Sequence, residues 1–535
     1  MTGVLSQLVS DLQSPAAYDH PIDAVEVVQT HISYILLAGD YAYKIKKPLN
    51  LGFLDYSTLE RRRLLCEDEV RLNRRLCDGI YLGVVAITRA EDGTHRIEGT
   101  GAVIEYAVHM RRVRDERTMP HLLASGRLHR EHLASLASKI ASFHRDADRS
   151  ERIATFGRVP AVRTNWDENF AQTAPYVGRT LTGAQLDHVR AYVDRFLGEQ
   201  GVLIEERVDT GRVRDGHGDL RTDSVVFAPE GSVCVMDCIE FNERLRCGDV
   251  ASDVAFLAMD LEFRGHRREA DEFVSLYMES QGGDDTLPAV LNFYRVYRAF
   301  VRGKVDSMQA SEAEVPAAQR SQARERARRY FRLAATYAER SSPQTVIMMV
   351  GLSGVGKSLI ARALAGRAGA VLLSTDMIRR ERAEPASLGS ALYGAAAYTP
   401  RGRDLVYAEM MERARSHLAL KRSVVLDATF LMRQQRGLAR QLAASADVPL
   451  LVVSVSAPED VVRARLMARA AGVASDARWD TYVAQRERFE PLDDIAPTQI
   501  RTLDSTCPLN VLVDEVLDAL DTLAKSGHSA RRRRS

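Results

Sequence analysis

The segment Gly351-Leu-Ser-Gly-Val-Gly-Lys-Ser358 decides the fold of the C-terminal third of the chain. It has the spacing G-x-x-x-x-G-K-S, follows the apolar run Thr345 to Val350, and precedes an alanine- and leucine-rich stretch that is typical of a helix. In such a loop, backbone N–H groups and the N-terminus of the following helix converge on phosphate oxygens. We therefore predict a P-loop that binds a nucleoside triphosphate, with ATP as the expected ligand.

Each part of this loop has a predicted role. Lys357 is expected to reach the β- and γ-phosphates and to act in catalysis, and Ser358 to offer its hydroxyl to Mg²⁺. The residues expected to contact ATP are Gly351, Ser353, Gly354, Val355, Gly356, Lys357 and Ser358.

The sequence around the loop alternates between strand-like and helical segments. Apolar, strand-like runs cover 345–350, 370–375, 423–427, 450–456 and 499–503, with helical patterns between them. This alternation predicts a three-layer α/β/α domain with a parallel sheet over residues 345–525. The remaining residues, 526–535, end in four arginines and a serine and are expected to form a disordered basic tail.

Two aspartates follow strands of this predicted sheet, where a parallel sheet opens a ligand crevice. Asp427 is the candidate metal ligand, although Asp is also favoured in turns. Asp376 is the candidate catalytic base, although it could equally be a helix cap. Arg379, one helical turn later, is the candidate residue for binding an anionic substrate.

Arginines on the helical segment after 450–456 could close over the triphosphate. Arg465 and Arg469 are four residues apart and therefore share one helix face. We expect them to bind the nucleotide as part of a lid, while a solvated basic face is the alternative.

Together these motifs resemble P-loop kinases that phosphorylate hydroxyl groups, including gluconate-kinase-like and polynucleotide-kinase-like members. The resemblance covers about 345–525 and rests on the P-loop, Ser374-Thr-Asp-x-x-Arg379 and Asp427-Ala-Thr-Phe430. It implies a kinase that uses ATP and Mg²⁺ more strongly than it implies any particular acceptor.

The first 340 residues have a different pattern. Strand-like segments, including 32–38 and 41–47, and a charged helical run from Thr58 to Leu76 precede about residue 110, and helical periodicity dominates afterwards. This predicts an α+β domain with a small β-rich lobe and a larger helical lobe. Ser341-Ser-Pro-Gln344 breaks a long helical run and marks the expected boundary.

Two aspartates of this domain lie beside β-rich stretches, as phosphoryl transfer in kinase-like folds requires. They are Asp219, in His217-Gly-Asp219, and Asp237, of which one would take or orient the acceptor hydroxyl and the other would hold Mg²⁺. A phosphate-binding lysine paired with a helix glutamate is also expected. Lys44 and Lys46 face one side of their predicted strand, and Glu69 lies in the following helical run.

These residues resemble the aminoglycoside phosphotransferase-like branch of the protein-kinase-like, bilobal fold. Its H-G-D loop matches His217 to Asp219, and its downstream G-D…D-x-A pattern matches Gly248-Asp249…Asp253-Val-Ala255. The resemblance implies that Asp219 is the catalytic residue and Asp237 the Mg²⁺ ligand. It also implies a phosphate-binding lysine, for which we choose Lys44 with Lys46 second, and Glu69 as its helix partner. The family's loop has a metal-binding asparagine five residues after its aspartate, where this chain has Ser224. Active transfer and ATP binding without turnover both stay open for this half.

The order of the two halves is similar to that of bacterial proteins described as bifunctional aminoglycoside phosphotransferase/ATP-binding proteins. The resemblance implies ATP-dependent phosphorylation of a small-molecule hydroxyl, with the N-terminal half as a second kinase or a regulatory domain. One alternative is a nucleotide-sensing regulator with an inactive N-terminal half. Another is a polynucleotide 5′-hydroxyl kinase.

Composition sets wider limits. A chain of 535 residues, 45% of them hydrophobic, suggests two domains, and a net charge of +1 does not favour nucleic acid as a partner. No apolar run is long enough to span a membrane, so we expect a cytoplasmic protein. The six cysteines lack metal-site spacing and are expected to be reduced, structural thiols. The acceptor and the oligomeric state are left open.

Overall fold

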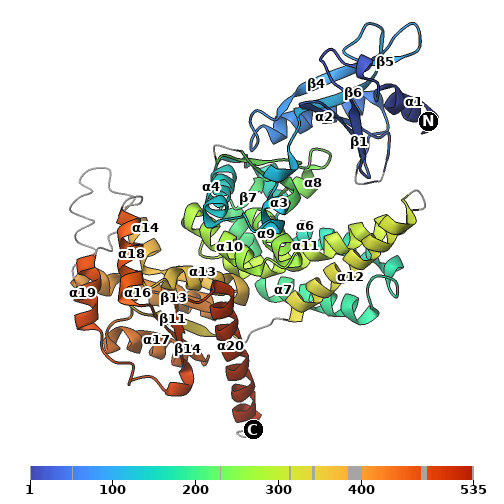
Figure 1. The fold of residues 1–535 in the computed structure, drawn as a ribbon. Helices are drawn as coiled ribbons and strands as arrows, with labels where there is room; N and C mark the ends of the chain where they lie inside the picture. The colour runs from blue at the N-terminus through green and yellow to red at the C-terminus, as the bar shows by residue number, and fades with distance from the viewer. Residues whose placement is uncertain are drawn as a thin grey trace. The chain divides into compact units, whose positions relative to one another are not determined.

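The computed structural model describes the chain except residues 1, 51, 53, 229–230, 313–314, 340–343, 384–399, 471–478 and 533–535 (Figure 1). Backbone contacts group the chain into two compact units. Unit 1 comprises Met1–Val162, Val208–Asp260 and Met308–Ala323, and unit 2 comprises Arg163–Arg207, Leu261–Ser307 and Arg324–Ser535. Each unit contains one of the two predicted nucleotide sites.

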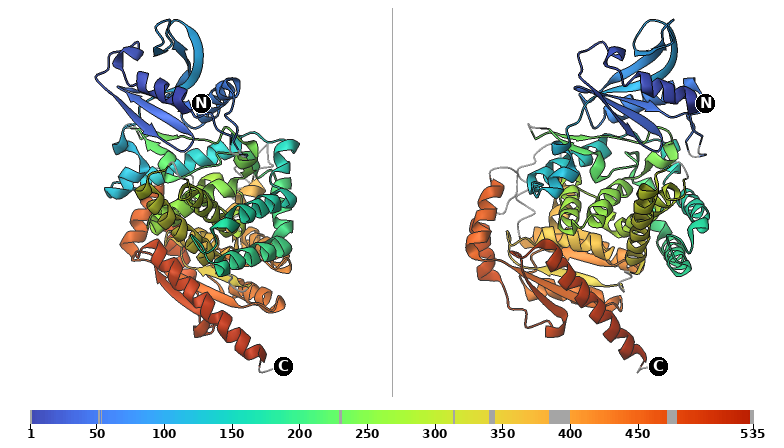
Figure 2. Two further views of the ribbon diagram at one scale, coloured as in Figure 1. Left: turned by 90° about the vertical axis from the view of Figure 1, so that its right-hand side faces the viewer. Right: turned by 45° about the vertical axis from the view of Figure 1, so that its right-hand side comes forward.

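Unit 1 begins with a six-stranded antiparallel sheet, drawn in blue in Figure 2, with the strand order β1-β2-β3-β6-β4-β5. Alternation along β3 sends Tyr43 and Ile45 into a core with helix α1, whereas Ala42 packs in the core that α2 covers on the other face. The elements are α1 (Thr2–Asp11), β1 (Val25–Gln29), β2 (Ser33–Ala38), β3 (Tyr41–Lys46), α2 (Leu59–Asn73), β4 (Tyr81–Arg89), β5 (His95–Ile97) and β6 (Ala102–Arg111).

The rest of unit 1 is mainly helical and contains two small antiparallel sheets, β10-β7 and β8-β9. The connection from β7 to β8 carries His217 to Asp219, and the connection after β9 carries Asp237. The elements are α3 (Met119–Ala124), α4 (Arg130–Asp146), α5 (Glu151–Thr155), β7 (Val213–Asp215), β8 (Val225–Phe227), β9 (Val233–Val235), α8 (Glu243–Arg246), β10 (Cys247–Asp249) and the first part of α9 (Val250–Phe263).

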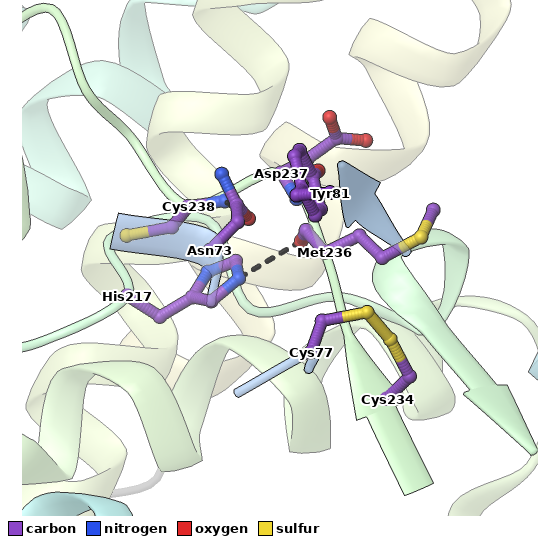
Figure 3. The surroundings of a disulfide bond; sticks show 8 residues. All are labelled: Asn73, Cys77, Tyr81, His217, Cys234, Met236, Asp237 and Cys238. Atoms are coloured by element: carbon purple, nitrogen blue, oxygen red, sulfur yellow. Dashed lines mark hydrogen bonds between the residues drawn. A yellow bond between two sulfur atoms is a disulfide. The ribbon is translucent and has the colours of Figure 1, made fainter. Parts of the chain in front are cut away.

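A disulfide joins Cys77, just after α2, to Cys234 on β9 (Figure 3). The expectation of reduced thiols was therefore wrong for these two residues, while Cys66, Cys238, Cys247 and Cys507 are free. The two cysteines are 157 residues apart, and folding brings their Cα atoms to 4.5 Å. Sequence spacing could not reveal a pair that tertiary packing creates.

The C-terminal part of unit 2 has a five-stranded parallel sheet in the order β12-β13-β11-β14-β15, which confirms the predicted α/β class. Ile347, Val425 and Leu451 pack in a core with α13 and α20, and α16 and α17 contact strands of the same sheet. The strands are β11 (Val346–Val350), β12 (Val371–Ser374), β13 (Val424–Asp427), β14 (Leu450–Ser456) and β15 (Ile500–Asp504).

Helices connect these strands and cover the sheet. They are α13 (Lys357–Ala368), α14 (Thr375–Ala383), α16 (Pro400–Ala419), α17 (Arg433–Ser445), α18 (Glu459–Ala470), α19 (Trp479–Arg488) and α20 (Leu509–Arg532). The last of these extends into the segment 526–535, which the sequence predicts to be disordered. Within this extension, Ala530, Arg531 and Arg532 are good helix formers, and no proline interrupts the helix.

Unit 2 also includes helices from the expected helical lobe: most of α6 (Val159–Thr173), α7 (Gly183–Asp209), α10 (Arg267–Gln281), α11 (Leu287–Gln309) and most of α12 (Ala317–Glu339). Helix α10 contacts α13 and α20, and Asp271 forms a buried ion pair with Arg367 at 3.2 Å. Because of this packing, the contact-based grouping differs from a division near residue 340. In the described part of the chain, every helix is too short or too polar to cross a membrane.

Candidate functional site

The P-loop of unit 2 connects β11 to α13 at the carboxyl ends of the parallel strands. Gly351 donates its N–H to Thr429 O at 3.2 Å and has a φ of 144°. A Cβ atom added to Gly351 would lie 2.4 Å from Val455 O, so a larger residue would displace the loop. The glycine therefore allows the loop to turn tightly against β14.

Lys357 and Ser358 begin α13 directly behind the loop. Lys357 is 8% exposed and its Nζ donates to Leu352 O at 2.7 Å, while the Ser358 hydroxyl is hydrogen-bonded to Asp427. Burial and, more weakly, Asp376 raise the pKa of Asp427 above its ordinary value, against the effect of Lys357. The structure thus brings the predicted lysine, hydroxyl and carboxylate together at one edge of the sheet.

Asp376 and Arg379 lie on α14, the helix after β12. Ser374 pairs in register with Asp427, so the start of α14 and the predicted metal ligand share the same sheet edge. Arg379 Nη1 donates to Asp376 Oδ1 at 2.6 Å, and the Asp376 side chain is 71% exposed. The predicted base and the predicted substrate arginine therefore contact each other.

Arg465 of α18 contacts the P-loop. Its guanidinium donates to Ser505 Oγ at 2.8 Å and to Val355 O at 3.3 Å. It is thereby tied to the loop after β15, which the sequence did not link to the site. The side chain of Arg469 lies outside the described residues.

A further contact at the P-loop involves Gln485 of α19. Its Oε1 accepts the backbone N–H of Ser353 at 2.8 Å. Because P-loop N–H groups are the donors that bind phosphate, Gln485 occupies a donor of the predicted nucleotide site. No motif distinguishes this glutamine in the sequence, and we did not predict it.

In unit 1, the predicted lysine of β3 lies between two carboxylates. Lys44 Nζ is 2.7 Å from Glu69 Oε1 and 3.1 Å from Asp237 Oδ1. Burial opposes the charge of Lys44, but Asp237 and Glu69 outweigh it and raise its pKa well above the ordinary value. The charge of Lys44 lowers the pKa of Asp237 in turn.

Lys46, the second choice, lies deeper. Its side chain is 1% exposed, with Nζ 2.5 Å from Glu69 Oε2 and in an ion pair with Glu240. Tyr56 also donates to Glu240 Oε1, at 2.5 Å. Both lysines thus share Glu69, but Lys44 alone contacts the predicted metal ligand.

Asp253 of α9 fixes the backbone of the H-G-D loop. Its carboxylate accepts hydrogen bonds from the N–H groups of His217 at 2.7 Å and Gly218 at 3.0 Å. His217 Nε2 lies 2.9 Å from Met236 O (Figure 3), and its Nδ1 accepts the Asp219 N–H at 3.3 Å. Burial lowers the pKa of His217. The neutral imidazole, protonated at Nε2, therefore ties the Asp219 loop to the strand that leads to Asp237.

Asp237 has a φ of 61°, which is uncommon for a residue with a side chain. Its N–H donates to the Tyr81 hydroxyl at 3.2 Å, and the next N–H, of Cys238, donates to Asn73 Oδ1 at 2.9 Å (Figure 3). Residues of β4 and α2 thus fix the backbone in this conformation. Strain of this kind concentrates at functional sites.

The donor sets fit ATP and Mg²⁺ in both units. In unit 2, glycine-rich backbone, Lys357 and the Ser358–Asp427 pair offer the N–H groups, cation and oxygen ligands that a magnesium–triphosphate complex needs. In unit 1, Lys44 and Asp237 offer a cation and an oxygen ligand. Within the described ranges, the structure shows no cluster of three or more His, Cys, Asp or Glu side chains that could hold a metal ion.

Known proteins share both parts of the chain. The AAA_33 family model, described as an AAA domain, matches residues 346–492. Uncharacterized protein Rv2004c of Mycobacterium tuberculosis and Mb2027c of Mycobacterium bovis are each 34% identical over 485 residues, covering 86% of this chain and 93% of theirs.

Solved structures give weaker likenesses. The GDP complex of aminoglycoside 2′-phosphotransferase-IIIa is 15% identical with a TM-score of 0.39, covering 62% of this chain and 98% of its own. The Mycobacterium tuberculosis APS kinase CysC, in complex with AMPPNP and APS, is 19% identical with a TM-score of 0.26, covering 34% of this chain and 98% of its own. The chain belongs to the family of these mycobacterial proteins, and its residues 346–492 match the AAA_33 domain model.

Proposed function

We propose that the P-loop domain of unit 2 transfers the γ-phosphoryl group of ATP to a hydroxyl group of a small molecule. The observation that carries the proposal is that three groups lie at one sheet edge: Ser358 and Asp427, which form a pair behind the P-loop, and Asp376 at the start of the helix after the neighbouring strand. A P-loop alone would serve hydrolysis or switching equally well. An exposed carboxylate beside it can accept a proton from an acceptor hydroxyl.

In the proposed reaction the acceptor oxygen bonds to the γ-phosphorus, and the bond from that phosphorus to the β–γ bridging oxygen breaks. ADP leaves, and the hydroxyl proton passes to the Asp376 carboxylate. Lys357 and the loop N–H groups hold the phosphates, and Asp427 with Ser358 would hold Mg²⁺, which neutralises phosphate charge when bound. Arg379, now paired with Asp376, would turn to an anionic acceptor and leave the carboxylate to the hydroxyl.

For unit 1 we propose a second nucleotide site, with Lys44 on the phosphates, Glu69 orienting it, Asp237 holding Mg²⁺ and Asp219 facing the acceptor. The ion pair of Lys44 with Asp237 supports this assignment over Lys46, which pairs with Glu240 instead. If this site transfers phosphate, the protein is a bifunctional kinase. If it only senses ATP, unit 1 regulates the kinase of unit 2.

The test is labelled ATP with a panel of sugars, aminoglycosides and 5′-hydroxyl oligonucleotides. We expect a labelled small molecule whose formation Lys357→Ala abolishes and Arg71→Ala, at an exposed position of α2, leaves unchanged. Asp219→Ala assigns any activity that survives Lys357→Ala to unit 1. Nucleotide binding with only residual hydrolysis across the whole panel would instead establish the nucleotide-sensing alternative.

The polynucleotide alternative has a distinct signature. Neutralising several phosphates releases counterions, so affinity for a 5′-hydroxyl oligonucleotide would fall steeply with salt. We expect no such dependence, since the chain's net charge is only +1.

A further inference from the structure

The catalytic loop of unit 1 lacks the metal-binding asparagine of related loops, and the structure shows what its replacement does. The Ser224 hydroxyl donates to Arg221 O at 2.7 Å and accepts the Arg221 N–H at 3.1 Å. Ser224 is 3% exposed. Both contacts close a turn within the loop, so this hydroxyl serves the backbone and not a ligand.

A positive charge, that of Arg221, lies beside the predicted catalytic carboxylate of Asp219. Arg221 Nε and Nη2 donate to the two Oδ atoms of Asp219, each at 3.0 Å. Its Nη1 donates to Asp223 Oδ2 at 2.9 Å. The paired N–H groups of a guanidinium match a phosphoryl group as well as they match a carboxylate.

The carboxylates of the site would leave bound ATP with too little positive charge around it, and Arg221 could supply that charge. Asp219 and Asp237 are two carboxylates close enough for Asp219 to oppose the lowered pKa of Asp237, and ATP would add several negative charges. Lys44 already faces Glu69 and Asp237. Without the asparagine ligand, the side of the site next to Asp219 needs a cation from another source.

We propose that Arg221 binds the γ-phosphate of ATP in unit 1 and supplies the positive charge that related loops draw from an asparagine-held metal ion. In the nucleotide-free protein the guanidinium rests on Asp219. When ATP binds, it turns to the γ-phosphate, whose oxygens accept the same two N–H groups. Asp219 is then released toward the acceptor.

This inference rests on the proposal that unit 1 binds ATP, and the experiment separates the two. Calorimetry is done on the full chain carrying Lys357→Ala, so that the P-loop site is silenced, with Mg-ATP and Mg-ADP. Lys44→Met in the same background identifies the signal of unit 1. Absence of any Lys44-dependent signal would refute the second nucleotide site itself.

With that signal present, Arg221→Gln is expected to weaken Mg-ATP binding by about 10-fold or more, the range for a hydrogen bond to a charged group. Mg-ADP binding should change less than 2-fold, because ADP lacks the γ-phosphate. Arg221→Lys keeps a charge without the paired N–H groups and should fall between. Arg71→Gln, at an exposed position of α2, is the control and should match the parent.

Equal losses of ATP and ADP affinity in both Arg221 variants would show that the arginine only shapes the loop, and no loss in either would show that it does not meet the nucleotide. Each result overturns the inference. Ser224→Asn adds a second measurement that does not depend on Arg221 variants. With Mn²⁺ as the probe, we expect one bound ion per ATP in the parent and an additional, weaker one in Ser224→Asn, and two ions in the parent would contradict the proposed substitution.

Discussion

The two candidate sites differ in the groups that they offer to phosphate. Unit 2 uses backbone geometry: a glycine-rich turn, one lysine that donates to a carbonyl, and a hydroxyl on a carboxylate. Unit 1 uses side-chain charges that are already paired, Lys44 with Glu69 and Asp237, and Arg221 with Asp219. A site made of backbone can be recognised from a short motif, whereas a site made of paired charges depends on distant segments meeting.

The largest effect that separates the two designs is expected at Lys46. Lys46→Met leaves Glu69 and Glu240 buried with one cation fewer, which should destabilise unit 1 by about 3–5 kcal/mol. Hydrogen exchange of amides in β3 and α2 measures this, since both tryptophans, Trp166 and Trp479, belong to unit 2.

The control for Lys46 is Lys47→Met. Lys47 directly follows β3 and its side chain is partly exposed, so we expect a loss of unfolding free energy of less than about 1 kcal/mol. A loss at Lys46 no larger than at Lys47 would mean that the buried carboxylates of unit 1 do not depend on this lysine.

The next effect is on binding. Lys357→Ala removes the charged donor of the P-loop and should weaken Mg-ATP binding to unit 2 by about 100-fold, with little change in unfolding free energy. Calorimetry in a Lys44→Met background, where unit 1 is silenced, gives the value. If Lys357→Ala lowered the unfolding free energy as much as Lys46→Met does, the lysine of unit 2 would also be a structural charge, and this difference between the units would not exist.

The sequence predicts unit 2 well because its signals are local. The P-loop, the five strands and the positions of Asp427 and Asp376 follow from short patterns, and the strands differ from the structure by a residue or two at most. The contact of Gln485 with Ser353 could not be predicted, because a glutamine on a surface helix has no distinguishing neighbours.

In unit 1, the sequence predicts the position of the H-G-D loop, but it does not predict the network of buried ion pairs around Lys44 and Lys46. His217 to Asp219, Asp237 and Glu69 were identified by resemblance, and the sequence could not decide between Lys44 and Lys46, since both point to one face of β3. Tertiary packing alone brings Glu240 to Lys46 and Cys234 to Cys77. The use of Ser224 within its own turn likewise required coordinates.

The two units are also expected to differ in how their stability depends on pH. Each contains a histidine whose pKa is lowered by burial. His217 of unit 1 has the Asp253 carboxylate to oppose the shift, whereas His417 of unit 2 faces Arg422, and its pKa falls to about 4. A histidine with a depressed pKa gives stability that is present above its unfolded pKa of about 6.5 and is lost as the pH falls toward 4.

Unit 2 should therefore lose on the order of 1–2 kcal/mol between pH 6.5 and 4 through this group, after allowance for its partial exposure. Tryptophan fluorescence during urea unfolding reports on unit 2 and measures the loss. His417→Gln keeps a hydrogen-bond acceptor for Arg422 and should flatten the pH dependence, while His266→Gln in the same unit should not. An unchanged pH dependence in His417→Gln would assign the acid sensitivity to other groups.

The smallest expected effect concerns the one described P-loop donor that a side chain occupies. If Gln485 competes with phosphate for the Ser353 N–H, then Gln485→Ala removes the competitor, and Mg-ATP affinity at unit 2 should rise by about 2- to 10-fold, the range for one neutral hydrogen bond. Gln485→Glu keeps an acceptor and adds negative charge beside the phosphates, so it should lower the affinity instead. A decrease in both variants would mean that Gln485 moves with the loop and helps to hold the nucleotide, in which case unit 2, like unit 1, relies on a side chain that changes partner when ATP arrives.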